Sequence, residues 1–87
     1  MTNILQENIA VDSIQLAAYL HTLKIPIKRI EKSGRFGCFF FPEDQARSEI
    51  EKFYLGKAVV EPRIFSAAIR ELRSMIEQLE TRGSNVG

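Results

Sequence analysis

The sequence has one cysteine, one histidine and no tryptophan among its 87 residues. The single cysteine, Cys38, excludes an intrachain disulfide, and small secreted domains often depend on such bonds. The single histidine, His21, leaves no set of His and Cys residues at the spacing of a zinc site. We therefore expect no metal or other cofactor, and a reducing, cytoplasmic location.

Long apolar stretches and a large net charge are also absent. No stretch approaches the roughly 20 apolar residues of a membrane-spanning helix, and we see no signal peptide. The formal net charge is +1, whereas duplex-DNA binders usually carry a stronger positive excess, because phosphate contacts dominate their affinity. We therefore expect no membrane contact, and nucleic acid would need a local basic patch.

The composition is that of an ordinary globular domain, with 45% hydrophobic and 26% charged residues. The length predicts a single domain, which we assign to residues 12–81. Residues 1–11 are expected to form a loose N-terminal arm or one short strand at 9–11. Residues 82–87 are expected to form a flexible, solvated tail.

Three segments carry the apolar spacing of a helix. The first begins at Asp12 or Ser13, either of which can act as an N-cap, and ends before Pro26. The second covers residues 43–57, and the third starts at Pro62 and is the longest. In the second helix the expected apolar stripe is Ala46, Ile50, Phe53 and Tyr54. In the third it is Phe65, Ala68, Ile69, Leu72, Met75, Ile76 and Leu79.

A β-hairpin is predicted between the first two helices, because residues 25–32 and 35–41 flank the turn sequence Ser33-Gly34. Pro42 ends the second strand. Side chains alternate along a strand, so Phe39 and Phe41 are expected to lie with Ile27 in the core beneath the helices. The opposite face is the candidate partner interface, buried either within the molecule or in a homodimer: Ile30, Phe36, Cys38 and Phe40. The fold class is thus α+β, a hairpin packed with three helices in the order α-β-β-α-α.

The stretch from Gly34 to Phe41 partly matches the central-strand pattern of RNA-recognition motifs. Phe36, Gly37 and Phe41 agree with that pattern, but its first two positions are swapped and Cys38 replaces an aromatic that stacks on a base. The first strand of such a fold would lie within "ILQENIAV", which has no aromatic residue. The last strand would fall on "VVEPRIF", where proline and a strong helical pattern argue against it. We therefore treat the match as mostly coincidental.

Residues 12–79 more closely resemble a small, uncharacterised domain family of prokaryotes and phages. The family combines a Leu-Ala-rich helix, a hairpin ending in Phe-x-Phe-acidic, a helix closing in Tyr-x-x-Gly and a final helix rich in Leu and Arg. Pro42 departs from this pattern by interrupting the step from phenylalanine into acidic residues. The resemblance implies a fold rather than an activity. It is carried by "LAAYL" at 16–20, Phe39, Phe41, "YLGKAVV" at 54–60, Phe65 and "RELRSMI" at 70–76.

No group of residues predicts catalysis. Cys38 with His21 as its base would be a nucleophile pair, but a thiol inside an aromatic strand is expected to stay protonated and inert. The acidic residues at the start of the second helix fit the helix dipole and a solvated face; they are Glu43, Asp44, Glu49 and Glu51. We therefore predict that the protein is not an enzyme.

Two functional hypotheses remain from the sequence. The first is a non-catalytic protein-interaction or regulatory module, a homodimer, of phage or mobile-element origin and acting on a host complex. The alternative is a nucleic-acid-binding regulator that uses the basic hairpin, with Phe36 adding stacking. Its candidate contacts are Lys28, Arg29, Lys32 and Arg35.

Overall fold

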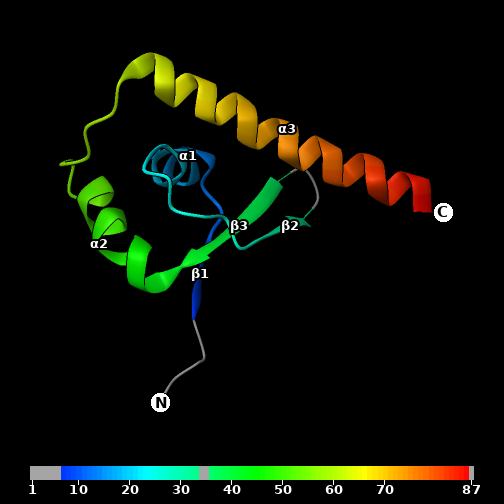
Figure 1. Cartoon of the computed structure of the whole chain (residues 1–87), viewed down its shortest axis with the longest axis horizontal. Coiled ribbons are helices and arrows are strands. Elements are labelled where there is room, and N and C mark those ends of the chain that lie inside the picture. The colour runs from blue at the N-terminus through cyan, green and yellow to red at the C-terminus, as the bar shows by residue number, and fades with distance from the viewer. Residues whose placement is uncertain (1–6, 34–35, 87) are drawn as a thin grey trace.

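The computed structural model describes residues 7–33 and 36–86, without the side chains of Ser33, Phe36 and residues 80–86. In this part of the chain it has a three-stranded antiparallel sheet and three helices (Figure 1), which confirms the α+β class. The elements in chain order are β1 (Asn8–Val11), α1 (Ile14–Thr22), β2 (Arg29–Ser33), β3 (Phe36–Pro42), α2 (Glu43–Tyr54) and α3 (Pro62–Val86).

The segment before α1 forms the third strand of the sheet. β1 pairs antiparallel with β3, and the strand order β1-β3-β2 makes β3 the central strand. Ile9 lies opposite Phe41 and Val11 opposite Phe39, while the Val11 side chain is buried in the core. Of the two expectations for residues 1–11, the described part therefore shows the strand, and burial of Val11 helps to hold it there.

The predicted hairpin is present, but β2 starts at Arg29, later than expected. Before it, Ile25 is buried in the core instead of continuing the strand. Ile30 lies opposite Phe39, and directly opposed residues of an antiparallel pair project from the same face. The prediction that Ile30 shares the face of Cys38 and Phe40 was therefore wrong. Ile30 is partly buried against the core, as is Ile27.

All three helices lie on the same side of the sheet as Phe39 and Phe41, and α1 lies between α2 and α3 (Figure 1). The described elements thus form one layer of helices packed on one face of the sheet. The largest fully buried side chains are Phe39, Phe41, Leu20 and Leu72. The core thus joins β3 to α1 and α3, as predicted for the two phenylalanines.

Local capping explains where the helices begin and end. Ser13 Oγ accepts a hydrogen bond from the Leu16 backbone N–H at 3.2 Å, and Glu61 Oε1 accepts one from the Ile64 N–H at 3.0 Å. At the end of α2 the Lys57 N–H donates to the Lys52 carbonyl at 2.8 Å, around Gly56 with φ of 74°. This is the Schellman ending that favours glycine. α3 continues to Val86, beyond the apolar pattern that ends at Leu79.

The order β-α-β-β-α agrees with the first five elements of the β-α-β-β-α-β motif, and β1 lies where the RNA-recognition reading required a first strand. The sixth element differs, because residues 62–86 form α3 instead of a strand. Pro62 explains this, since its fixed φ suits the first turn of a helix and it lacks the N–H that a strand needs. The structure therefore departs from the RNA-recognition motif at its last strand, the position where proline and the helical pattern of the sequence argued against a strand.

Candidate functional site

The face of the sheet away from the helices carries Cys38 and Phe40 from the central strand. The register places Arg29 and Ala10 on either side of Phe40. The Arg29 guanidinium lies over the Phe40 ring, 4.1 Å from its centroid, and pairs with Glu31 at 2.9 Å. Arg29 and Glu31 thus cover part of this face, and Phe40 is half-buried rather than exposed. Phe36 belongs to β3, but its side chain lies outside the described residues.

The described side chains of this face lack the features of a base-stacking platform. Cys38 takes the place of one aromatic, the Phe40 ring is covered by Arg29, and β1 contributes Asn8 and Ala10. Recognition of single-stranded RNA by a sheet depends on aromatic side chains open to the bases. The structure gives the described part of this face no such open ring.

The Cys38 thiol is half-buried on the same face. Burial raises the pKa of the Cys38 thiol, and the negative charges of Asp12 and Glu31 raise it further. His21 contacts α3, which packs on the other side of the sheet, so it does not meet Cys38 as a base. The structure therefore separates the two residues of the nucleophile pair considered from the sequence, and it disfavours a thiolate.

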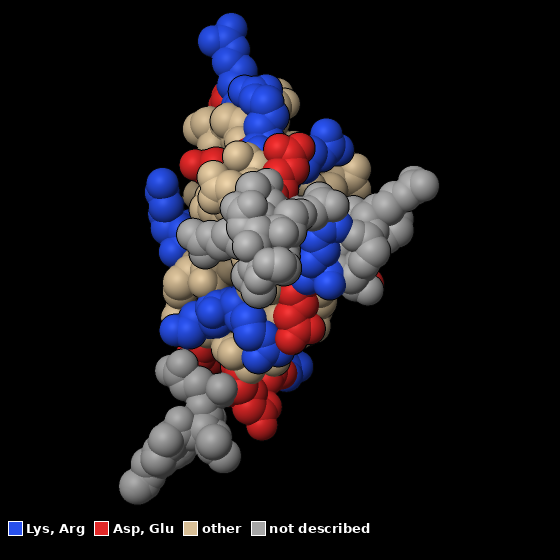
Figure 2. Space-filling model, turned by 90° about the vertical axis from the view of Figure 1, so that its right-hand side faces the viewer, with Lys and Arg blue, Asp and Glu red and all other residues tan. Residues whose placement is uncertain are grey.

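The basic residues of the hairpin are dispersed. Arg29 lies on the open face. Lys32 is opposite Gly37 and so belongs to the helix side, whereas Lys28 is exposed just before β2. Arg35 lies outside the described residues. Figure 2 shows positive and negative side chains interspersed on the side of the molecule that it presents, without one large patch of a single sign.

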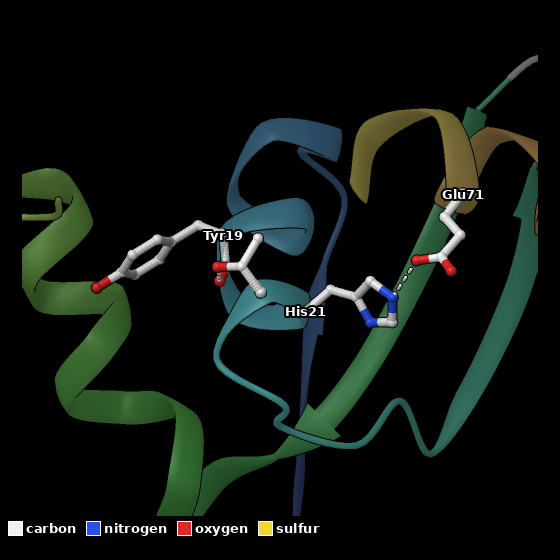
Figure 3. A network of polar contacts seen from close by, with 4 residues as sticks. Tyr19, His21 and Glu71 are labelled. Atoms are coloured by element: carbon white, nitrogen blue, oxygen red, sulfur yellow. Dashed lines mark hydrogen bonds and ion pairs between the residues drawn. The ribbon is translucent and has the colours of Figure 1, made fainter. Parts of the chain in front are cut away.

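Two polar contacts join α1 to the other helices. The Tyr19 hydroxyl donates to Glu49 Oε1 on α2 at 2.8 Å. His21 Nε2 lies 2.8 Å from Glu71 Oε1 on α3 (Figure 3). Burial, with the hydrogen bond to Glu49 and its negative charge, raises the pKa of the Tyr19 hydroxyl. Glu49, one of the four acidic residues noted in the sequence, thus orients Tyr19. Glu43 pairs with Arg47 within α2, while Asp44 and Glu51 are exposed.

The most exposed apolar side chains lie elsewhere, around the connector between α2 and α3. Four large hydrophobic residues there are 57–87% exposed. We call these four the connector patch: Tyr54, Leu55, Val59 and Ile64. Sequence reasoning missed this surface, and it wrongly placed Tyr54 in the buried stripe of α2. Tyr54 is 72% exposed, while the neighbouring Phe53 packs against the core and meets the Tyr54 ring edge-on.

The connector patch is exposed because its flanking residues fill the core positions. Ala58, Val60 and Phe65 are partly buried against the core, so Val59 and Ile64 point away from it. The Schellman ending turns the chain at Gly56 and leaves Leu55 outside. The sequence did contain a signal for this surface. Leu55 and Val59 are apolar residues that lie outside the apolar stripes expected for the second and third helices.

A cleft of about 610 Å³ lies between the end of α1, the start of β2 and the second half of α3. It has a mainly apolar lining with His21, Lys24 and Arg29 among its residues. The sequence did not predict this cleft, because its walls come from three segments that are distant along the chain.

Among the described residues, no three His, Cys, Asp or Glu side chains come together as metal ligands. Within the same ranges, no helix is both long and apolar enough to cross a membrane. No protein-family model, curated protein or solved structure matches the chain. The resemblance to the phage and prokaryotic family therefore stays a prediction.

Proposed function

We propose that the protein is a non-catalytic interaction module, and that a second copy of the chain binds its connector patch. The observation that carries this proposal is the exposure of Tyr54, Leu55, Val59 and Ile64 in one short segment. Contiguous exposed apolar surface in a small domain is typical of a protein-binding site. Such exposure is costly to maintain in water without a partner.

The charges around the connector patch favour a second copy as the partner. Exposed residues of both signs lie beside it in the sequence, with Glu51 and Glu61 negative and Lys57 and Arg63 positive. A two-fold dimer brings the same surface together from both subunits, so a patch with both signs at its margin can pair with itself. Association would also add to the marginal core of an 87-residue domain.

The mass of the protein in solution tests this proposal. We expect light scattering to give about twice the chain mass of 9.9 kDa, and Val59→Asp to return the mass to that of one chain. Val59 is 87% exposed, so the variant should keep the circular dichroism spectrum and melting temperature of a folded domain. An unpaired buried carboxylate at the interface would cost several kcal/mol of association.

Phe40→Asp is the matched variant, because it places the same charge on the open face of the sheet. We expect Phe40→Asp to remain a dimer. A wild-type protein that is monomeric at high concentration would overturn the proposal. A dimer that Phe40→Asp splits and Val59→Asp leaves intact would move the contact to the face of Cys38 and Phe40.

A further inference from the structure

We propose that the cleft between α1, β2 and α3 binds a small amphipathic anion, a free carboxylate with a medium-length acyl chain. This site is separate from the connector patch and does not depend on the proposed dimer. Its lining comes from the C-terminal end of α1, the segment after it, the start of β2 and the second half of α3.

The size and lining of the cleft fit the acyl chain. Its volume of about 610 Å³ is within the roughly 300–1,000 Å³ of small-molecule sites. Such sites are mostly apolar, with a few polar groups that orient the ligand. Six of the nine lining residues are apolar: Ile25, Pro26, Ile27, Ile30, Met75 and Leu79.

Of the remaining three lining residues, Lys24 favours a negative head group. The three are His21, Lys24 and Arg29, and none of the nine is acidic. Arg29 is held by Glu31 and Phe40, and His21 is held by Glu71. Lys24 is exposed and has no ion-pair partner among the described residues, so its ammonium group is the one that would meet a carboxylate.

The backbone of Lys24 gives a second reason to single out this residue. Its φ is 65°, the left-handed conformation that glycine normally provides at the end of a helix. The Ile25 N–H bonds the Leu20 carbonyl and the Lys24 N–H bonds the His21 carbonyl, at 3.3 and 3.0 Å. α1 therefore ends in a Schellman turn with lysine in the glycine position. Backbone strain of this kind clusters at functional sites, where the surrounding structure holds it in place.

The carboxylate would lie beside Lys24, with the chain directed along the apolar wall formed by Ile27, Met75 and Leu79. Each methylene removed from water should then add to the affinity. Full burial of one methylene corresponds to about a fourfold gain, and a cleft open to solvent should give about two- to fourfold.

The test is a titration of ¹⁵N-labelled protein with hexanoate, octanoate and 1-octanol, followed by amide chemical shifts. We expect octanoate to shift residues 21–30 and the second half of α3, and to bind about four- to fifteenfold more tightly than hexanoate. 1-Octanol, with the same chain and no charge, should bind about fivefold more weakly than octanoate.

Lys24→Gly separates binding from folding. It removes the cation and relieves the positive φ, so we expect the melting temperature to rise by about 4 °C or more while octanoate affinity falls about fivefold. Lys57→Gly makes the same chemical change far from the cleft and should leave the affinity unchanged.

Three outcomes would overturn the proposal. The first is the absence of localised shifts at millimolar octanoate. The second is equal affinity for octanoate and 1-octanol with no effect of Lys24→Gly, which would show an apolar cavity without anion preference. The third is a set of chemical-shift changes at the cleft that grows with protein concentration in the absence of octanoate. This result would show that a second copy of the chain occupies the cleft.

Discussion

The two faces of β3 differ sharply although both carry phenylalanine. Phe39 and Phe41 are 1% and 0% exposed, whereas Phe40, between them, is half-buried. Alternation along a strand sends neighbours to opposite faces, and the helices cover only one of them. The difference shows that the same residue type fills the core on one face and lies under the Arg29 guanidinium on the other.

The largest expected effect compares the two faces directly. Phe41→Ala should lower the free energy of unfolding by about 3–5 kcal/mol, because it leaves a cavity in the core. Phe40→Ala should lower it by only about 1 kcal/mol, since it loses a half-buried ring and a cation–π contact. Urea denaturation followed by circular dichroism measures both. Equal losses for the two variants would show that the open face is as well packed as the helix side.

A smaller effect is expected at Gly37, on the helix side of β3. A Cβ built on Gly37 would lie 2.5 Å from Ile76 Cδ1 and 2.9 Å from its Cγ1. Gly37→Ala should therefore cost about 1–3 kcal/mol through overpacking between β3 and α3. Denaturation of Gly37→Ala alone and with Ile76→Val measures the coupling, and we expect the second change to recover part of the loss.

Gly56→Ala is the matched control for Gly37→Ala. No atom lies within 4 Å of the added Cβ, but φ is +74°, so the cost of about 1 kcal/mol comes from the backbone. Ile76→Val should not alter the cost at Gly56. If it changes both glycine variants equally, the contact with Ile76 is not the cause at Gly37.

The smallest effect concerns the chemistry of the open face. Because the pKa of the Cys38 thiol is raised, its thiolate fraction at neutral pH is lower than that of an ordinary cysteine. Alkylation by iodoacetamide should therefore be slower in the folded protein than in urea near pH 7. The alkylation rate should rise with pH as the thiolate forms. The pH at which it reaches half of its maximum should be higher in the folded protein than in the unfolded chain. A folded-state midpoint at or below the unfolded value would contradict the proposed surroundings of the thiol.

Much of the fold could be predicted, because the signals are local. Ser13 and Pro62 mark helix starts and Gly56 marks a helix end, since each has a conformational or hydrogen-bonding preference that acts within one turn. The alternation of β3 likewise identified Phe39 and Phe41 as core. The candidate site was predicted less well. Cys38 and Phe40 do share the open face, but Ile30 does not, and the connector patch was missed.

The sequence alone determined the three helices and the hairpin, and which side chains of β3 point in opposite directions. Only the tertiary structure decided which residues of β2 lie beside the side chains of β3. A shift of one residue in register turns every side chain of a strand to the other face. The tertiary structure also decided the exposure of Tyr54 and the formation of the cleft around Lys24. These depend on where distant segments pack, and the local preferences of the chain do not specify such contacts.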